Sequence, residues 1–170
     1  ALTFYQRLVP PGRPDDLALL RPLALSFLTS HVRDQQEYVR VEAYTMLAEL
    51  GLAETRAVLE DGLFDSSVLV RARAADAIGK AGLAGKSGPL RRALSDAMPA
   101  VRIAAMNALS EANVTDIMPY LIEVARTDDG PESVFASAAL YRLGKQDMLT
   151  DITGAVRPGG SNNSMGAYEK

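Results

Sequence analysis

Apolar residues recur along the chain with the three-to-four-residue spacing of an amphipathic helix, and the same helix occurs four times. The stretch VRVEAYTMLAELG, which begins at Val39, returns 31 residues later at Val70, then at Val101 and at Glu132. In each copy an alanine and, four residues on, a leucine or isoleucine share one helical face. Glycine or asparagine ends each copy, because these residues adopt a positive φ at little cost. The pattern therefore predicts four helices that end at Gly51, Gly82, Asn113 and Gly144.

Another helix is predicted before each of these four, at the same interval. Each begins its apolar face with leucine and has a second apolar residue four positions later. The pairs are Leu28 and Val32, Leu59 and Leu63, Leu90 and Leu94, and Leu121 and Ala125. A helix-turn-helix unit repeated with this period is typical of a solenoid, in which each unit buries its apolar face against its neighbours. We therefore predict an all-α, right-handed α-solenoid of four helix pairs, with short capping elements at both ends.

The turn inside each of the first three units carries an aspartate, and an arginine follows six residues later. These pairs are Asp34 and Arg40, Asp65 and Arg71, and Asp96 and Arg102. With the VR..A...L...G pattern of the second helix, they make residues 22 to 145 resemble the HEAT repeat. The short period is similar to the bacterial HEAT-like variety, which also occurs in phycobilin-lyase-type proteins.

The resemblance implies that the aspartates and arginines form a hydrogen-bonded ladder along the stack. In the fourth unit both members are replaced together, by Thr127 and Ser133. Joint replacement is expected of paired groups, since a partly buried charge left alone is costly. Asp128 or Asp129 could take over there.

The helix-ending residues divide the chain into units. We expect an N-terminal cap segment over 1–16, with a break at 10–16, and a C-terminal cap over 145–156. Residues 157–170, rich in Gly, Ser and Asn, are expected to form a flexible tail or a linker to a further segment. The first residue is alanine, which fits a processed form and a piece of a longer protein alike. The four repeats between the caps are 17–51, 52–82, 83–113 and 114–144.

The composition of the chain argues against nucleic-acid binding and against a membrane span. The chain has 170 residues, 48% hydrophobic and 23% charged, which suits one globular domain. A net charge of −3 without a basic stripe argues against nucleic-acid binding. The longest apolar run, 17–28, is interrupted by Arg21 and Pro22 and is shorter than the roughly 20 residues of a membrane span. No targeting segment is visible, so we expect a cytoplasmic location.

Candidate chemistry is sparse. The chain has no cysteine and one histidine, His31, which we interpret as a surface or packing residue. Asp128, Asp129 and Glu132 lie in a stretch with Gly and Pro, where turn formation explains them better than cation binding. The stretch GLAGKSGP at 82–89 lacks the full phosphate-loop pattern and is interpreted as a link between units. We therefore predict no catalytic residue, metal or cofactor, and a protein that is not an enzyme.

In a HEAT-like stack the second helices are expected to line the concave side. At 100° per residue, the helix face opposite Ala43 and Leu47 is mixed and lightly charged, as protein-binding grooves tend to be. We predict a non-catalytic scaffold or adaptor that binds a protein or peptide there; the alternative is a phycobilin-lyase-like chromophore- or cofactor-handling protein. Some of these side chains could instead pack against the adjacent unit, and the oligomeric state stays open. The expected partner-binding residues are Tyr44, Thr45, Asp76, Met106, Asn107 and Tyr141.

Overall fold

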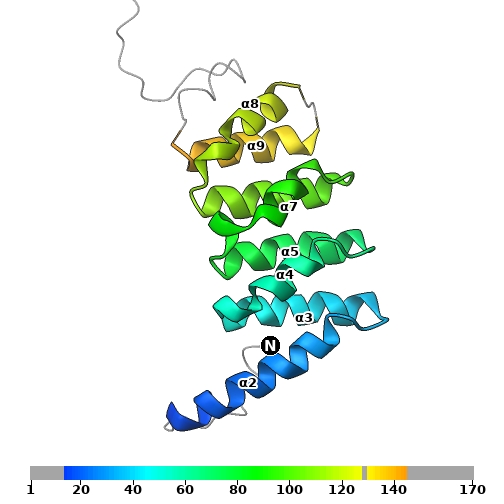
Figure 1. The fold of residues 1–170 in the computed structure, drawn as a ribbon. Helices are drawn as coiled ribbons and strands as arrows, with labels where there is room; N and C mark the ends of the chain where they lie inside the picture. Colours follow the sequence, from blue (N-terminus) through cyan, green and yellow to red (C-terminus); the bar gives the residue numbers. More distant parts are fainter. Residues whose placement is uncertain (1–13, 128–129, 145–170) are drawn as a thin grey trace, which may run out of the picture.

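The computed structural model describes residues 14–127 and 130–144, and all regular elements in these ranges are helices stacked in one row (Figure 1). The first helices of the four pairs are α2 (Pro14–His31), α4 (Arg56–Gly62), α6 (Gly88–Arg92) and α8 (Met118–Thr127). The second helices are α3 (Glu37–Leu50), α5 (Val68–Lys80), α7 (Pro99–Glu111) and α9 (Pro131–Arg142). Short 3-10 turns flank the first helices: η1 (Ala53–Thr55), η2 (Ala84–Lys86), η3 (Ala93–Ser95) and η4 (Thr115–Ile117). The chain is an all-α solenoid, as its sequence predicts.

Helix ends follow the local sequence. All four predicted cap residues have a positive φ, between 55° at Asn113 and 78° at Gly144. At helix starts, the Ser67 and Ser87 hydroxyls accept hydrogen bonds from backbone amides three residues later. The expected break over 10–16 is corrected at its end, because α2 already begins at Pro14, a residue suited to a first helical turn.

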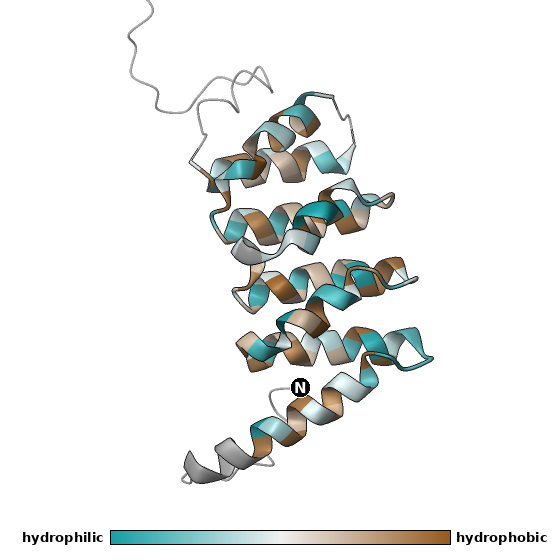
Figure 2. Cartoon of the chain, in the orientation of Figure 1, coloured by the Kyte–Doolittle hydropathy of each residue, from teal (hydrophilic) through white to brown (hydrophobic). Residues whose placement is uncertain are grey.

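The core runs along the whole stack as a continuous column. Leu47 and its counterparts in the other second helices, Ile78, Leu109 and Leu140, are all fully buried. Figure 2 shows apolar residues on every helix of the stack, as expected when each unit buries its face against its neighbours. Among the described residues, no helix is both long and apolar enough to cross a bilayer.

Each inner second helix contacts two other second helices, one on either side. The α3–α5, α5–α7 and α7–α9 pairs all pack directly. Small residues bring them close: a Cβ added at Gly79 would lie 2.8 Å from the Cβ of Ala108. An inner second helix is therefore covered on two sides, and only its remaining face is open to solvent or a partner.

Candidate interaction surface

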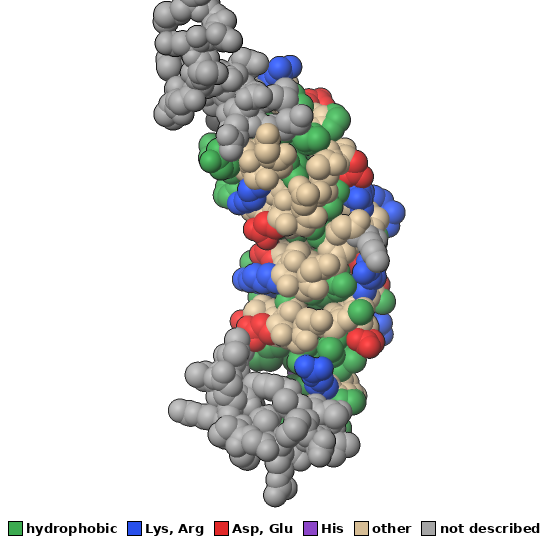
Figure 3. Space-filling view, turned by 90° about the vertical axis from the view of Figure 1, so that its left-hand side faces the viewer, with side chains coloured by type: hydrophobic (Ala, Val, Ile, Leu, Met, Phe, Trp, Pro, Cys, Tyr) green, Lys and Arg blue, Asp and Glu red, His purple; other side chains and the backbone are tan. Residues whose placement is uncertain are grey.

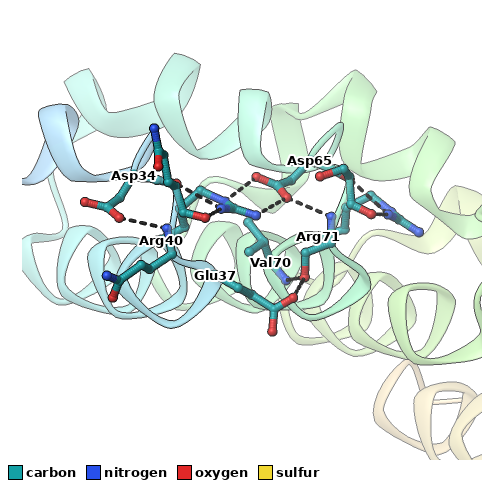
Figure 4. Close-up of polar contacts among 10 residues, drawn as sticks. Asp34, Glu37, Arg40, Asp65, Val70 and Arg71 are labelled. Atoms are coloured by element: carbon teal, nitrogen blue, oxygen red, sulfur yellow. Dashed lines mark hydrogen bonds and ion pairs between the residues drawn. The ribbon is translucent and has the colours of Figure 1, made fainter.

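The ladder that the sequence predicts is present, but its ion pairs join neighbouring units (Figure 4). Arg40 donates from Nε and Nη2 to the two carboxylate oxygens of Asp65, both at 2.9 Å. Arg71 makes the same two-point contact with Asp96, at 2.8 and 3.0 Å. The resemblance implied a ladder of these residues and did not say which carboxylate each arginine meets. The pairing that forms spans 25 residues and crosses the first two joints.

The ladder residues also hydrogen-bond to the backbone of the turn between the two helices of their own unit. The Nη1 groups of Arg40 and Arg71 donate to the backbone carbonyls of Asp34 and Asp65, each at 2.9 Å. The carboxylates of Asp34, Asp65 and Asp96 each accept from the backbone amide two residues later. Each arginine therefore ties the turn of its own unit to the turn of the next.

The ladder is electrostatically well matched. Hydrogen bonding from Arg71 holds the pKa of Asp96 below its usual range, and the same contact raises the pKa of Arg71. The Asp65 hydrogen bond raises the pKa of Arg40 in the same way. The side chains of Arg71 and Asp96 are each only 15% exposed. Their donors and acceptors are engaged within the protein, so we assign the ladder to the fold.

At the third joint the ladder continues with a different acceptor. Arg102 donates to both carboxylate oxygens of Glu132, at 2.7 and 2.5 Å, and to the carbonyl of Asp96 at 2.6 Å. The sequence interpretation placed Asp128 or Asp129 in this role, and those two residues lie outside the described ranges. Glu132 lies 30 residues after Arg102, and the longer glutamate reaches the guanidinium from the first turn of α9.

Two of the six expected partner-binding residues are inside the stack, so that prediction is wrong for them. Tyr44 is 3% exposed and Met106 is fully buried. The helical-wheel argument treated the face opposite Ala43 and Leu47 as open. In the structure the next unit covers that face, because a second helix has neighbours on both sides.

Tyr44 has a packing role that its neighbours explain. A Cβ at Gly62 would lie 2.6 Å from the Tyr44 ring, so the ring fits only because position 62 is glycine. Burial and the charge of Asp65 raise the pKa of Tyr44 to about 12. Its side chain borders an open groove of about 420 Å³ that Asp61 and Phe64 also line.

The face of the second helices that remains open is a quarter turn away from the predicted one. It carries Thr45, Asp76 and Asn107, three of the predicted partner-binding residues, all half-buried. We call this face the outer strip, and its positions recur with spacings of 4, 3 and 4 residues on each helix. Its residues are Tyr38, Glu42, Thr45 and Glu49; Leu69, Arg73, Asp76 and Lys80; Ala100, Asn107 and Glu111; and Pro131, Phe135, Ala138 and Arg142. Ala104, at the remaining position of the series on α7, is buried.

The two ends of the outer strip differ in chemistry. Its end nearest the ladder exposes apolar side chains, with Tyr38 66% and Leu69 51% exposed. At its other end four exposed charges alternate in sign from unit to unit: Glu49, Lys80, Glu111 and Arg142. Figure 3 likewise shows acidic and basic side chains spread along the stack, without one patch of a single sign.

Polar side chains outside the ladder make fewer or longer contacts than those within it. Burial raises the pKa of Asp76, whose nearest cation is Arg73 at 3.9 Å. Arg142 donates to the Asn107 side-chain oxygen at 3.1 Å and to the Ser110 hydroxyl at 3.2 Å. Tyr141, the last predicted partner-binding residue, is 56% exposed but lies off the strip. It stands where Ser110 is buried one unit earlier, so its exposure reflects the end of the described stack.

His31 lies at the end of α2. Its Nδ1 is 2.7 Å from the carbonyl oxygen of Phe27, and the two rings are 4.2 Å apart. Within residues 14–127 and 130–144, no three His, Cys, Asp or Glu side chains gather as metal ligands would.

The family model described as HEAT repeats matches the chain over residues 25–96 and 59–144. The matched span covers more than half of the 170 residues, and the chain belongs to the HEAT-repeat family. No curated protein matches the chain significantly.

Proposed function

We propose that the chain is a non-catalytic scaffold that binds a protein or peptide along its outer strip. One observation carries the proposal. At every joint the ladder pairs an arginine with a carboxylate of the next unit, whereas the outer strip presents different side chains in each unit. A part that repeats serves the stack, while a part that varies among equal units is free to match something outside it.

The chemistry of the strip specifies the kind of partner. Exposed Tyr38 and Leu69 supply the apolar anchors that dominate protein interfaces, and aromatic residues are frequent among such anchors. The alternating row of Glu49, Lys80, Glu111 and Arg142 would select a segment with the opposite order of charges. Second helices pack about 8–10 Å apart, close to the rise of seven residues in an α-helix. A partner helix lying along the stack would meet successive units with every seventh residue.

The test compares proteins captured from the source cells by three forms of the full chain. Wild type, the Tyr38→Ala/Leu69→Ala variant and the Phe64→Ala variant serve as baits. Phe64 is the matched control, since it is 66% exposed but lies off the strip, after α4. We expect a protein held by wild type and Phe64→Ala that the strip variant captures about tenfold less, as hot-spot truncations do.

A second strip variant, Lys80→Glu, tests whether capture depends on the order of charges along the outer strip. It should weaken capture of the same protein while leaving helicity unchanged, because Lys80 is exposed. Capture that survives both strip variants but fails with Phe64→Ala would move the binding surface to the groove near Tyr44. Co-purification of a pigment or cofactor with no protein partner would favour the chromophore-handling alternative.

A further inference from the structure

The face of α9 that points away from α7 carries apolar side chains that are more exposed than their counterparts in the other units. Val134 is 68% exposed, whereas Val41, at the same position of the first unit, is 8% exposed. Tyr141 is 56% exposed, and Ser110 at the same position of the third unit is 3% exposed. In the inner units a following helix pair covers these positions. Within the described part of the chain, nothing covers them on α9.

The chain leaves α9 along the path that elsewhere leads directly into a first helix. Gly144 has a φ of 78°, and its amide donates to the carbonyl of Tyr141 at 3.1 Å. Gly51 and Asn113 make the same contact three residues back, at 3.2 and 3.1 Å. Two residues after each of these caps, at Ala53 and Thr115, a 3-10 turn opens the next first helix.

The residues after Gly144 keep the register of a first helix. Ile152 is 31 residues after Leu121, in a column whose four members are at most 7% exposed. Val156 is 31 residues after Ala125, in a column whose four members are at most 8% exposed. Met148, Ile152 and Val156 are spaced four residues apart and so share one stripe of a helix.

We propose that residues 145–156 dock on the exposed face of α9 as a first helix, with Met148, Ile152 and Val156 over Val134 and Tyr141. Leu121 and Ala125, the counterparts of Ile152 and Val156 one unit earlier, are buried. The apolar stripe and the exposed face of α9 would therefore cover each other. Covering α9 also removes an apolar end on which a second copy could stack head to tail.

Thiol chemistry tests the docking in the full chain. The chain has no cysteine, so Val134→Cys introduces a single thiol on the face in question. Iodoacetamide should modify this thiol about tenfold or more slowly than the thiol of Leu69→Cys on the outer strip, because the covered site must first open locally. Adding Ile152→Asp and Val156→Asp to Val134→Cys should restore rapid modification.

Thr150→Asp is the matched control in the same background. It adds one carboxylate, as each of those two substitutions does, at a position whose counterparts, Ser26, Ala57, Gly88 and Pro119, are all exposed, so protection should persist. Rapid modification of Val134→Cys in the otherwise unchanged chain would overturn the proposal, and so would protection that survives both aspartates. Protection that disappears on dilution would assign the face to a second copy. The melting temperature of each variant checks that the stack stays folded.

Discussion

The ladder and the outer strip lie on the same second helices but obey different rules. Arg71 and Arg73 illustrate this, since they are two residues apart on α5. Arg71 joins two units through a two-point contact with Asp96, in a geometry that Arg40 repeats with Asp65. Arg73 is 3.9 Å from Asp76, and its buried Nε has no hydrogen-bond partner. Of two arginines on neighbouring faces of α5, Arg71 therefore joins two units, whereas Arg73 makes no comparable contact.

Under the proposed function, the ladder serves stability and the outer strip serves recognition. Each contact of the ladder depends on residues 25 or 30 positions apart, so a change on one side requires a matching change on the other. On the outer strip only Arg142 and Asn107, among the described residues, are joined by a hydrogen bond between units. The residues of the strip differ in size and charge from unit to unit. Variation among the units of one chain therefore separates the two kinds of surface.

The largest expected effect comes from breaking the ladder. Arg71→Ala should lower the free energy of unfolding by about 3 kcal/mol, because it leaves the poorly exposed Asp96 carboxylate without its cation. Arg73→Ala, the matched variant, should stay within about 0.5 kcal/mol of wild type. Urea unfolding followed by circular dichroism measures both. Equal losses from the two arginines would abolish the distinction between ladder and strip.

A smaller effect should follow from disturbing the apolar side of one joint without touching either polar surface. Gly62→Ala places a methyl group 2.6 Å from the Tyr44 ring and 2.8 Å from the Cβ of Ala74. We expect a loss of about 1–2 kcal/mol, typical of overpacking a tight contact. Thermal unfolding of Gly62→Ala and of the double variant Gly62→Ala/Tyr44→Ala checks this. If the single variant is as stable as wild type, the ladder alone holds the joint.

The smallest effect, and the one that best separates the two surfaces, is the sign of a pH dependence. Arg71 lowers the pKa of Asp96, so the folded state binds this proton less readily than the unfolded chain does. Its stabilisation is complete above the ordinary carboxyl pKa of about 3.9 and is lost as the pH falls through the lowered value. Burial raises the pKa of Asp76, so there the folded state gains stability as the pH falls.

Urea unfolding between pH 7 and pH 2 measures this difference, with Asp96→Asn and Asp76→Asn as references. The stability of wild type relative to Asp96→Asn should decrease on acidification, and its stability relative to Asp76→Asn should increase. Slopes of the same sign would show that the two carboxylates share one environment.

The sequence predicted the repeated helices and the ladder because both depend on short-range spacing. In any unit, a leucine four residues from another apolar residue predicts a helix with one buried face, and a glycine after such a stretch predicts the end of the helix. Tyr44 and Met106 were misplaced because their burial depends on the next unit, and small residues such as Ala75 and Gly79 hide that second packing face from a hydrophobicity pattern. Glu132 was assigned to turn formation and not to the ladder for a related reason, since its reach toward Arg102 depends on where α9 begins.

Because the first two ladder contacts both span 25 residues, a whole unit could be removed from the chain and the remaining units could still form a ladder contact. Excising residues 65–95 would bring Asp96 to the position after Phe64, the same distance from Arg40 that Asp65 occupies now. Gly62 would then face Ala105 in place of Ala74, two alanines that are both fully buried. A gene encoding such a chain can lose or duplicate one unit without a new joint having to evolve. Each such event would also reorder the charges and apolar groups displayed along the stack, so that a change in length would change the surface on which the proposed binding depends.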